Sequence, residues 1–480
     1  METNELNRLK ESLIEILGEG SVETSGGVLL EYSSDMTENE PHLPEIVIYP
    51  ESTEQVSRCL ALAGKSGVPV VPRVYNTNLG GLAIPESGGI LMDLTRMNRI
   101  VEVNPRDLYM VIEPGVTQAD VHDLLEKEHP GLRFGYSLAP PDVSVLANCI
   151  MDGLVNLSYR FGAMGQWLNG LEVVLPDGEV VRTGSAAVVD SWHGEAPLPH
   201  LNSLFINTFG TTGVVTKAAV QLWPRPQFEE RYFVLCGDYD SAFSMITGLI
   251  DSEIPDDIGI LSWPIGKLLF GNKKPLYRDP AEPLFFVYVS ASSDRKAVIR
   301  DKCAHLGEIV SQLRGKGMRV EPPLEVGDLV AVEPSFASLT DFPMRLDFLL
   351  EHGGEGLTWL GTYGPVSKWT EGVKAGMEFL QRNGMPPIVV SRPMWGGHFI
   401  VLRFIMMFDR SDREEAGRIR RLNRGLFEKV IGLGYIPYKT PPWAYRMLID
   451  KMDPAFVKLM SSISRSLDPE RIMNPGKWPI

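Results

Sequence analysis

Short apolar runs alternate with polar segments in the first part of the chain. The run at 45–49 is followed by Ser52-Thr-Glu-Gln55, a pattern typical of a helix N-terminus, and then by apolar side chains at helical spacing between Val56 and Ala63. A second apolar run covers 68–71. Because the two runs flank one amphipathic helix, the pattern predicts a β-α-β unit.

The segment that follows is predicted to be mostly β, with short apolar runs bounded by turn residues. Thr117-x-x-Asp120 predicts one helix within it. Pro176-Asp-Gly178 separates two β-rich runs and predicts a hairpin. The predicted strands lie at 89–94, 100–103, 108–113, 171–175, 179–183 and 214–223.

The pattern changes after Pro224-Arg-Pro226, which marks a predicted domain boundary. From there to residue 434 the apolar positions indicate longer helices and strands. They include the apolar run 404–408 and an amphipathic helix expected to open at Ser411-x-x-Glu414. We therefore predict a first domain at 1–226 and a second at 227–434.

Composition narrows the functional classes. The chain has 46 Lys plus Arg against 61 Asp plus Glu, a formal charge of −15, which argues against a nucleic-acid partner. It has no apolar run of about 18 residues, and its first ten residues lack a signal-peptide pattern, so we expect no membrane span and a cytoplasmic location. The cysteines are too widely spaced for a metal motif, and we expect free thiols and no metal site. They are Cys59, Cys149, Cys236 and Cys303.

The segment 71–81 gathers an arginine, small polar side chains and two glycines into one turn between apolar runs. Glycines let a backbone approach an anion closely, successive amide N–H groups form an anion-binding concavity, and Arg73 can add charge-assisted hydrogen bonds. The composition suits a loop around a pyrophosphate, although an ordinary glycine turn explains it equally well. The chain has no Rossmann G-x-G-x-x-G and no G-x-x-x-x-G-K-[ST], so nicotinamide and P-loop nucleotide sites are not indicated.

Five further segments share an order with this loop. The six are Pro-Arg-x-x-x-Thr-Asn-Leu-Gly-Gly at 72–81, Glu-Pro-Gly-Val at 113–116, Ser-Val-Leu-Ala-Asn at 144–148, Gly-Leu-Glu-Val-Val-Leu-Pro-Asp-Gly-Glu-Val-Val-Arg-Thr-Gly at 170–184, Phe-Gly-Thr-Thr-Gly-Val-Val-Thr at 209–216 and Asp-Pro-Glu-Arg-Ile-Met-Asn-Pro-Gly-Lys at 468–477. Together they resemble the vanillyl-alcohol oxidase and para-cresol methylhydroxylase family of FAD-dependent oxidoreductases. The resemblance runs from about residue 45 to the end of the sequence.

The resemblance implies an α+β fold: a two-part FAD-binding domain, a cap domain with an antiparallel sheet, and a C-terminal segment, 435–480, that returns to the FAD-binding domain. The first loop would hold the FAD pyrophosphate. The residues that it implies for FAD binding are Pro72, Arg73, Tyr75, Asn76, Thr77, Asn78, Leu79, Gly80, Gly81, Pro114, Ser144, Asn148, Gly153, Gly162, Gly210, Thr211, Gly213, Val214, Val215, Asn474 and Lys477.

On the substrate side, Gly434-Tyr-Ile-Pro-Tyr-Lys439 is similar to the family's Gly-Tyr-x-x-Tyr-Arg element, whose Tyr and Arg face the substrate oxygen and the flavin. Tyr438 and Lys439 occupy those places. A cation there stabilises the negative charge that hydride arrival at the flavin N5 leaves on the ring. Without the resemblance, the two would be interpreted as a loop tyrosine and a solvated lysine.

The sequence also departs from the family. Leu79, Asn156 and Ala139 stand where phenol-oxidising members have two tyrosines and an aspartate, and Lys439 replaces an arginine whose planar fork a lysine lacks. The stretch 357–363 has no histidine for a covalent link, so we expect FAD to be bound non-covalently.

We therefore predict hydride transfer to FAD from a small organic substrate, aromatic or hydroxylated. Tyr438 and Lys439 would orient it, and His398, Tyr159 or Asp142 would accept the proton, although each of these three has an ordinary structural interpretation. A 2-hydroxy acid held by Arg392 or Lys439, with electrons passed to an acceptor protein, is one alternative. A non-catalytic subunit of a larger complex is another. We expect a homo-oligomer or a subunit of a complex.

Overall fold

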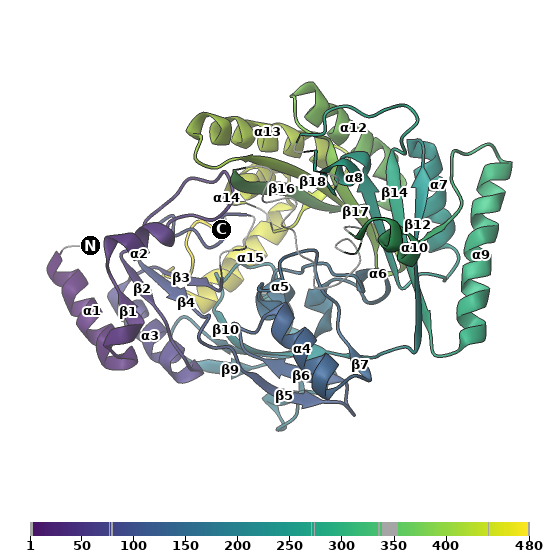
Figure 1. Cartoon of the computed structure of the whole chain (residues 1–480). Helices are drawn as coiled ribbons and strands as arrows, with labels where there is room; N and C mark the ends of the chain where they lie inside the picture. Colours follow the sequence, from purple (N-terminus) through teal and green to yellow (C-terminus); the bar gives the residue numbers. More distant parts are fainter. Residues whose placement is uncertain are drawn as a thin grey trace.

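The computed structural model describes residues 3–75, 77, 80–269, 271–272, 274–334, 337, 354–439 and 441–478. Figure 1 shows two smaller sheets on the side of the N-terminus and along the bottom of the molecule, and a large sheet above them. The last long helix, α15 (Pro454–Leu467), lies between the two halves. The mixture of helices and largely antiparallel sheets confirms the predicted α+β class.

The first sheet contains the predicted β-α-β unit. Its strand order is β1-β2-β4-β3, with β2 and β3 both parallel to β4, and helix α3 makes the crossover. Ser52 caps α3 by accepting a hydrogen bond from the Gln55 amide at 3.3 Å. The elements are α1 (Thr3–Leu17), β1 (Val22–Glu23), α2 (Gly26–Glu31), β2 (Ile46–Ile48), α3 (Thr53–Ser66), β3 (Val70–Arg73) and β4 (Ile90–Asp93).

The second sheet is antiparallel, in the order β5-β6-β10-β8-β9. Thr117 and Asp120 form a capping box at the start of α4, and β8 and β9 form the hairpin predicted around Pro176-Asp-Gly178. The elements of this part are β5 (Ile100–Asn104), β6 (Tyr109–Ile112), α4 (Gln118–Glu128), β7 (Leu132–Arg133), α5 (Val145–Ile150), α6 (Ser158–Phe161), β8 (Leu168–Val174), β9 (Val180–Arg182), β10 (Val214–Gln221) and β11 (Trp223–Pro224).

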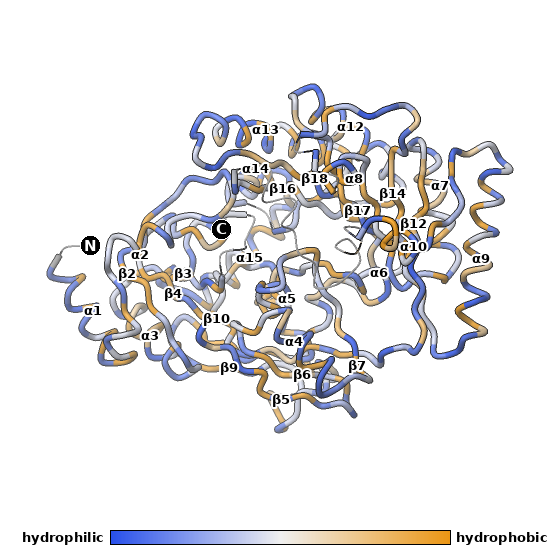
Figure 2. Tube along the Cα trace, in the orientation of Figure 1, coloured by the Kyte–Doolittle hydropathy of each residue, from blue (hydrophilic) through white to orange (hydrophobic). Residues whose placement is uncertain are grey.

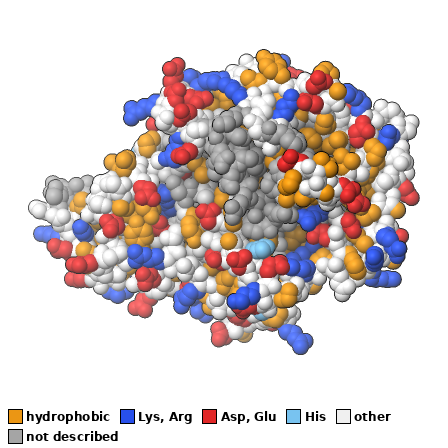
Figure 3. Space-filling model, in the orientation of Figure 1, with side chains coloured by type: hydrophobic (Ala, Val, Ile, Leu, Met, Phe, Trp, Pro, Cys, Tyr) orange, Lys and Arg blue, Asp and Glu red, His pale blue; other side chains and the backbone are white. Residues whose placement is uncertain are grey.

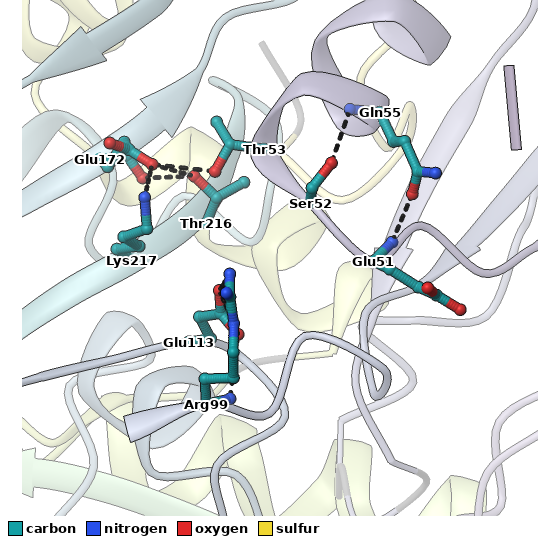
Figure 4. A network of polar contacts seen from close by, with 9 residues as sticks. All are labelled: Glu51, Ser52, Thr53, Gln55, Arg99, Glu113, Glu172, Thr216 and Lys217. Atoms are coloured by element: carbon teal, nitrogen blue, oxygen red, sulfur yellow. Dashed lines mark hydrogen bonds and ion pairs between the residues drawn. The ribbon is translucent and has the colours of Figure 1, made fainter. Parts of the chain in front are cut away.

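A buried carboxylate, Glu172 on β8, joins these two sheets (Figure 4). It accepts hydrogen bonds from Thr53 Oγ1 at the start of α3 at 2.9 Å and from Lys217 Nζ on β10 at 2.7 Å. Burial alone would raise the pKa of Glu172, but the hydrogen bonds from Lys217 and Thr53 outweigh it and the pKa is lowered. The contact fixes α3 against the second sheet and so positions β3, where the candidate pyrophosphate loop begins.

The third sheet has the order β15-β12-β14-β13-β17-β18-β16-β19 among the described residues, and all its strand pairs are antiparallel. The cap sheet was therefore predicted correctly. Its strands are β12 (Phe228–Cys236), β13 (Asp257–Ser262), β14 (Phe285–Ser293), β15 (Leu324–Glu325), β16 (Glu355–Gly364), β17 (Ile388–Met394), β18 (Phe399–Asp409) and β19 (Ile436–Pro437).

Four long helices cover one face of the third sheet and share one apolar core with it (Figure 1). They are α7 (Tyr239–Ile250), α9 (Lys296–Gly315), α12 (Trp369–Arg382) and α13 (Arg413–Ile431). Figure 2 shows the strands β14 and β18 as largely apolar and α9 as alternately polar and apolar. Shorter helices complete this half: α8 (Trp263–Leu269), α10 (Val326–Val332) and α14 (Pro442–Leu448).

The opposite face of the third sheet is turned toward the first half of the chain. Side chains alternate along a strand, so Leu402, Phe404 and Met406 of β18 enter the helix-covered core while Arg403 points to the other side. Trp359 and Tyr363 on β16 share the side of Arg403, because Leu360 between them enters the core. We call this side the site face.

Two details differ from the sequence predictions or extend them. Asp412, not Ser411, caps α13, because its side chain accepts hydrogen bonds from the amides of Glu414 and Glu415. At the other end, Asn474 and Ile472 exchange backbone hydrogen bonds with Val70 on β3, so the end of the chain lies against the first sheet. The domain boundaries after residues 226 and 434 remain predictions.

Charged side chains of both signs are interspersed on the face shown in Figure 3. No helix in the described part of the chain is long and apolar enough to cross a membrane. The four cysteines are free thiols, as expected, and three of them are buried.

Candidate functional site

Two adjoining cavities lie in the first half of the chain, and the first of them is also bounded by the site face. The first, which we call the cation cavity, has a volume of about 670 Å³ and is lined by Lys439 and Arg403. The second, the glycine cavity, has a volume of about 720 Å³ and is lined by Gly210 and Gly213. Val74, Ala147 and Met151 line both, so the two cavities share a wall.

The glycine cavity collects most of the segments that the resemblance implicated in FAD binding. Gly210 has a φ of +73°, and a Cβ there would stand 2.5 Å from Pro72 Cγ, so the backbone can follow this path only without a side chain. Gly213 is equally restricted, since a Cβ would lie 2.8 Å from the Val174 carbonyl oxygen. The predicted residues that line this cavity are Pro72, Arg73, Tyr75, Pro114, Gly210, Gly213, Val214 and Val215.

Arg73 is held rigidly at the wall of this cavity. Its Nη1 donates to the Tyr32 carbonyl at 3.2 Å, and its guanidinium lies 4.5 Å from the centre of the Tyr32 ring. Burial lowers the pKa of Arg73. Tyr75 Oη donates to the Gly115 carbonyl at 2.8 Å, which ties the loop to the second sheet.

Other loop residues are placed differently or are not described. Asn76, Asn78 and Leu79 lie outside the described residues. Thr77 lines the cation cavity, and Gly80 is buried. The Gly81 amide donates to Asp35 Oδ2 at 2.8 Å.

The C-terminal segment supports the glycine cavity from behind. Asn474 Nδ2 donates to the carbonyls of Leu82 at 3.0 Å and Phe209 at 2.6 Å, two residues that line the cavity. Lys477 is 0% exposed and donates to the Gly81 carbonyl at 2.8 Å. Neither Asn474 nor Lys477 is among the described residues that line the two cavities, so they position the wall.

Lys439 enters the cation cavity from the segment after β19. Its Nζ donates to Asn148 Oδ1 at 2.6 Å. Burial, and secondarily the positive charge of Arg403, lowers the pKa of Lys439 to about 7. Lys439 is therefore not a freely solvated surface lysine, because its amine is partly buried at the cavity and bonded to Asn148.

Arg403 is a residue of this site that the sequence analysis did not identify. Its Nη2 donates to the Tyr438 hydroxyl, and its guanidinium lies 4.3 Å from the centre of the Trp359 ring. Its Nε is buried and has no hydrogen-bond partner among the described residues. Tyr438 in turn stacks on Tyr363, with ring centres 4.5 Å apart and planes at 3°. A charged residue inside the apolar run 400–408 was the available signal.

Helix α5 supplies the floor of the cation cavity. Ser144 caps the helix by accepting from the Ala147 amide at 3.0 Å, and its hydroxyl donates to the Pro114 carbonyl at 2.5 Å. Asn148 stands one turn later, and a Cβ at Gly153 would lie 2.0 Å from its Oδ1. A residue larger than glycine at position 153 would therefore displace the Asn148 side chain, which accepts the hydrogen bond from Lys439.

Several predicted residues do not line either cavity in the described part of the chain. His398 and Asp142 are exposed, and Tyr159 lies in the cap core with its hydroxyl 3.5 Å from the Ile250 carbonyl. None of the three is among the described residues that line a cavity. Gly162 closes α6 against Gln166, and Thr211 bonds to Thr208, because local packing and turn formation occupy them.

The remaining residues predicted on the substrate side differ in whether they line a cavity. Ala139 lines the cation cavity, whereas Asn156 accepts from the Tyr136 amide at 2.9 Å and serves the local backbone. Arg392 forms a buried ion pair with Asp257 and is therefore already neutralised. Of the two carboxylate-binding cations proposed above, only Lys439 lines a cavity within the described part of the chain. No group of acidic, His or Cys side chains in that part could hold a metal ion.

Comparison with known proteins gives the chemical class. Residues 44–184 match a family described as FAD binding domain. Glycolate oxidase subunit GlcD of Bacillus subtilis is 31% identical over 263 residues, which span 53% of this chain and 53% of that protein. The flavoprotein subunit of 4-cresol dehydrogenase [hydroxylating] of Pseudomonas putida is 24% identical over 98% of this chain and 95% of its own length.

The fold extends the match to the whole chain. The crystal structure of p-cresol methylhydroxylase with substrate bound superimposes with a TM-score of 0.87 and 19% sequence identity, covering 99% of this chain and 97% of that one. The fold and the matches define an FAD-dependent oxidoreductase. More specifically, the chain is similar in sequence and in fold to flavoproteins of the p-cresol methylhydroxylase type. The predictions of an enzyme and of FAD are confirmed.

The residues present fit FAD. The adjoining cavities offer an extended site in two parts, and the restricted glycines Gly210 and Gly213 let the backbone approach a bound group closely. Arg73 at the wall of the glycine cavity is a fixed positive charge. Lys439 and Arg403 place positive charge beside the neighbouring cavity.

Proposed function

We propose that the protein oxidises a small organic substrate, aromatic or hydroxylated, in the cation cavity, and that FAD occupies the glycine cavity and extends to their shared wall. FAD, when bound, accepts the hydride removed from the substrate carbon. The observation that carries this proposal is that Arg403 and Lys439 line a cavity that adjoins the candidate FAD-binding segments. Tyr438, which does not itself line the cavity, is hydrogen-bonded to Arg403.

Polar and apolar residues would bind different parts of the substrate. Arg403 and Tyr438, joined by a hydrogen bond, would hold the substrate oxygen and stabilise negative charge on it. Leu138, Met151 and Trp359 give the cavity an apolar lining that suits an aromatic or alkyl body and excludes water.

A second candidate substrate is a 2-hydroxy acid. The buried Nε of Arg403 has no partner among the described residues, and a carboxylate would satisfy it in the bidentate manner that arginine favours. Glycolate oxidase subunit GlcD is among the relatives, which supports this candidate. Lys439, rather than the neutralised Arg392, would be the second cation in that case.

We further propose that FAD is held without a covalent bond. The stretch expected to carry a covalent link in related proteins is β16, where Tyr363 donates through its hydroxyl to the Asp152 carbonyl at 2.8 Å and stacks on Tyr438. A tyrosine engaged in this way supports the non-covalent interpretation. We also propose that the reduced FAD passes its electrons either to oxygen or to a partner protein.

Anaerobic titration of the purified holoenzyme tests the function. We would add 4-methylphenol, 4-hydroxybenzyl alcohol, glycolate and D-lactate in turn and follow the visible absorbance of FAD. Bleaching by the phenolic compounds supports the first candidate, and bleaching by the hydroxy acids alone supports the second. Absence of bleaching by every compound would contradict both. Readmitting air, with and without a cytochrome, then shows which acceptor restores the absorbance.

A further inference from the structure

The environment of Lys439 is unusual for a lysine. Its amine donates to the neutral Asn148 amide at 2.6 Å and has no ion pair within hydrogen-bond distance among the described residues. The charged and titratable groups that face it are Arg403 from β18, Cys149 from α5, and Asp152 from the turn after that helix. Lys439 is therefore a partly buried amine with a neutral partner and a fixed cation nearby.

This environment favours the neutral amine. Burial penalises the ammonium form most, and the guanidinium of Arg403 repels it further, while Asp152 opposes them only in part. The pKa of Lys439 falls to about 7 as a result. An arginine in the same place would stay protonated, since guanidinium does not lose its proton in proteins.

The cavity offers few other proton acceptors. Among the described residues that line it, the ionisable side chains are Arg403 and Lys439. The nearby carboxyl of Asp152 accepts a hydrogen bond from the Gly165 amide at 3.1 Å and is not among those lining residues. His398, Tyr159 and Asp142 are elsewhere, as described above.

We propose that Lys439 is the proton acceptor of the oxidation, a catalytic base that works as a neutral amine. The substrate O–H bond breaks and its proton moves to Nζ, which becomes an ammonium. The electron pair left on oxygen forms the C=O bond as the substrate carbon loses its hydride to FAD. Arg403 keeps its charge throughout and stabilises the oxygen as its proton leaves. The inference rests on the proposed function, because it assumes that the substrate occupies the cation cavity.

Ionisation of Lys439 can be measured without any substrate. We would label the holoenzyme with [ε-13C]lysine, assign the Lys439 signal by its loss in Lys439→Arg, and titrate its chemical shift by NMR. We expect a midpoint near the value of about 7 that the environment dictates. A midpoint near the ordinary lysine pKa of about 10.4 would overturn the proposal. This result stands whatever the anaerobic titration shows.

The base role requires a second comparison. Lys439→Arg keeps a positive charge at every pH but cannot accept a proton, and Lys439→Met has neither property. We expect the rate of flavin reduction by the bleaching compound to fall by about 10²- to 10⁴-fold in both variants, as for the loss of a general base. In the unmodified enzyme the rate should rise with pH through about 7, because the base is the neutral form.

Activity of Lys439→Arg decides between base and electrostatic roles. If Lys439 acts only as a positive charge, Lys439→Arg would keep its rate and Lys439→Met alone would lose it, and the proposal would be wrong. Both variants must retain the bound FAD spectrum for the comparison to count. If one releases FAD, the NMR titration and the pH profile of the unmodified enzyme still decide the question.

Discussion

The guanidinium of Arg403 donates a hydrogen bond to the hydroxyl of Tyr438, although the two residues are 35 positions apart in the sequence. Tyr438 is fixed from its other side by stacking on Tyr363. Arg403 lies on β18, Tyr363 on β16 and Tyr438 directly after β19, so three neighbouring strands of one sheet hold the group in place. A rigid sheet, not a loop, thus orients the cation that we assign to the substrate.

Replacing Arg403 by methionine should remove the cation while keeping an unbranched side chain. We expect kcat/KM with the bleaching compound to fall by about 10- to 150-fold, the value of a hydrogen bond to a charged group. Steady-state kinetics measure the effect. Arg382→Met, at an exposed position on α12, is the control and should leave kcat/KM unchanged. An unaltered value in Arg403→Met would show that the substrate lies elsewhere.

Asn148→Asp should move the pH profile of the enzyme. The new carboxylate would stand beside Lys439 Nζ, where the amide oxygen is now 2.6 Å away, and an opposite charge favours the ammonium form. The pKa of Lys439 should therefore rise by about 1 to 3 units, and the pH at which flavin reduction reaches half its maximum should rise with it. Asn272→Asp, on the surface, should leave the profile in place. If the pH profile does not shift, ionisation of Lys439 does not set the pH dependence of flavin reduction.

Gly210→Ala should weaken FAD binding. The residue has a φ of +73°, and its new Cβ would meet Pro72 Cγ at 2.5 Å. A strained backbone of this kind costs about 1 to 3 kcal/mol, which corresponds to a rise in the Kd for FAD of about 5- to 150-fold if the cost falls on the bound form. Fluorescence titration of the apoprotein with FAD measures it. Gly131→Ala is the control, since a Cβ there meets nothing within 4 Å.

Lys477→Met should destabilise the fold. It removes the hydrogen bond to the Gly81 carbonyl and the ion pair with Glu86 from a site that is fully buried. A lost hydrogen bond to a charged group costs about 1.5 to 3 kcal/mol in the free energy of unfolding. Urea denaturation of the apoprotein gives the difference. Lys458→Met, at an exposed position on α15, should change it by less than about 0.5 kcal/mol.

Acid precipitation tests the mode of FAD attachment. We expect trichloroacetic acid to leave all of the flavin in the supernatant, because the proposed binding is non-covalent. Absorbance spectra of the pellet and the supernatant distinguish the cases. Yellow protein in the pellet would show a covalent bond, and peptide mapping would then locate it.

Local signals predicted much of the fold. Ser52 with Gln55, Thr117 with Asp120, and the turn at Pro176-Asp-Gly178 act within a few residues, and the structure shows the helix starts and the hairpin that they encode. The start of α13 was missed by one residue, because Ser411 and Asp412 are both good caps and the backbone selected the second.

The substrate side was less predictable. His398, Tyr159 and Asp142 lie close in sequence to segments of the site, but side-chain direction depends on the path of the chain, which leaves two exposed and one in the cap core. Arg403 was hidden in an apolar run, and only the pairing of β18 with β16 and β17 shows which face it lies on. A local sequence pattern does not predict which distant strands pair with one another.

The return of the chain end to β3 bears on the order of events in the cell. Asn474 holds the carbonyls of Leu82 and Phe209 in the wall of the glycine cavity, and Ile472 bonds to Val70 beside it. During synthesis these partners leave the ribosome long before residues 472–477 do. The wall of the cavity therefore stays incomplete until residues 472–477 have been made, and tight capture of the cofactor should not precede that point.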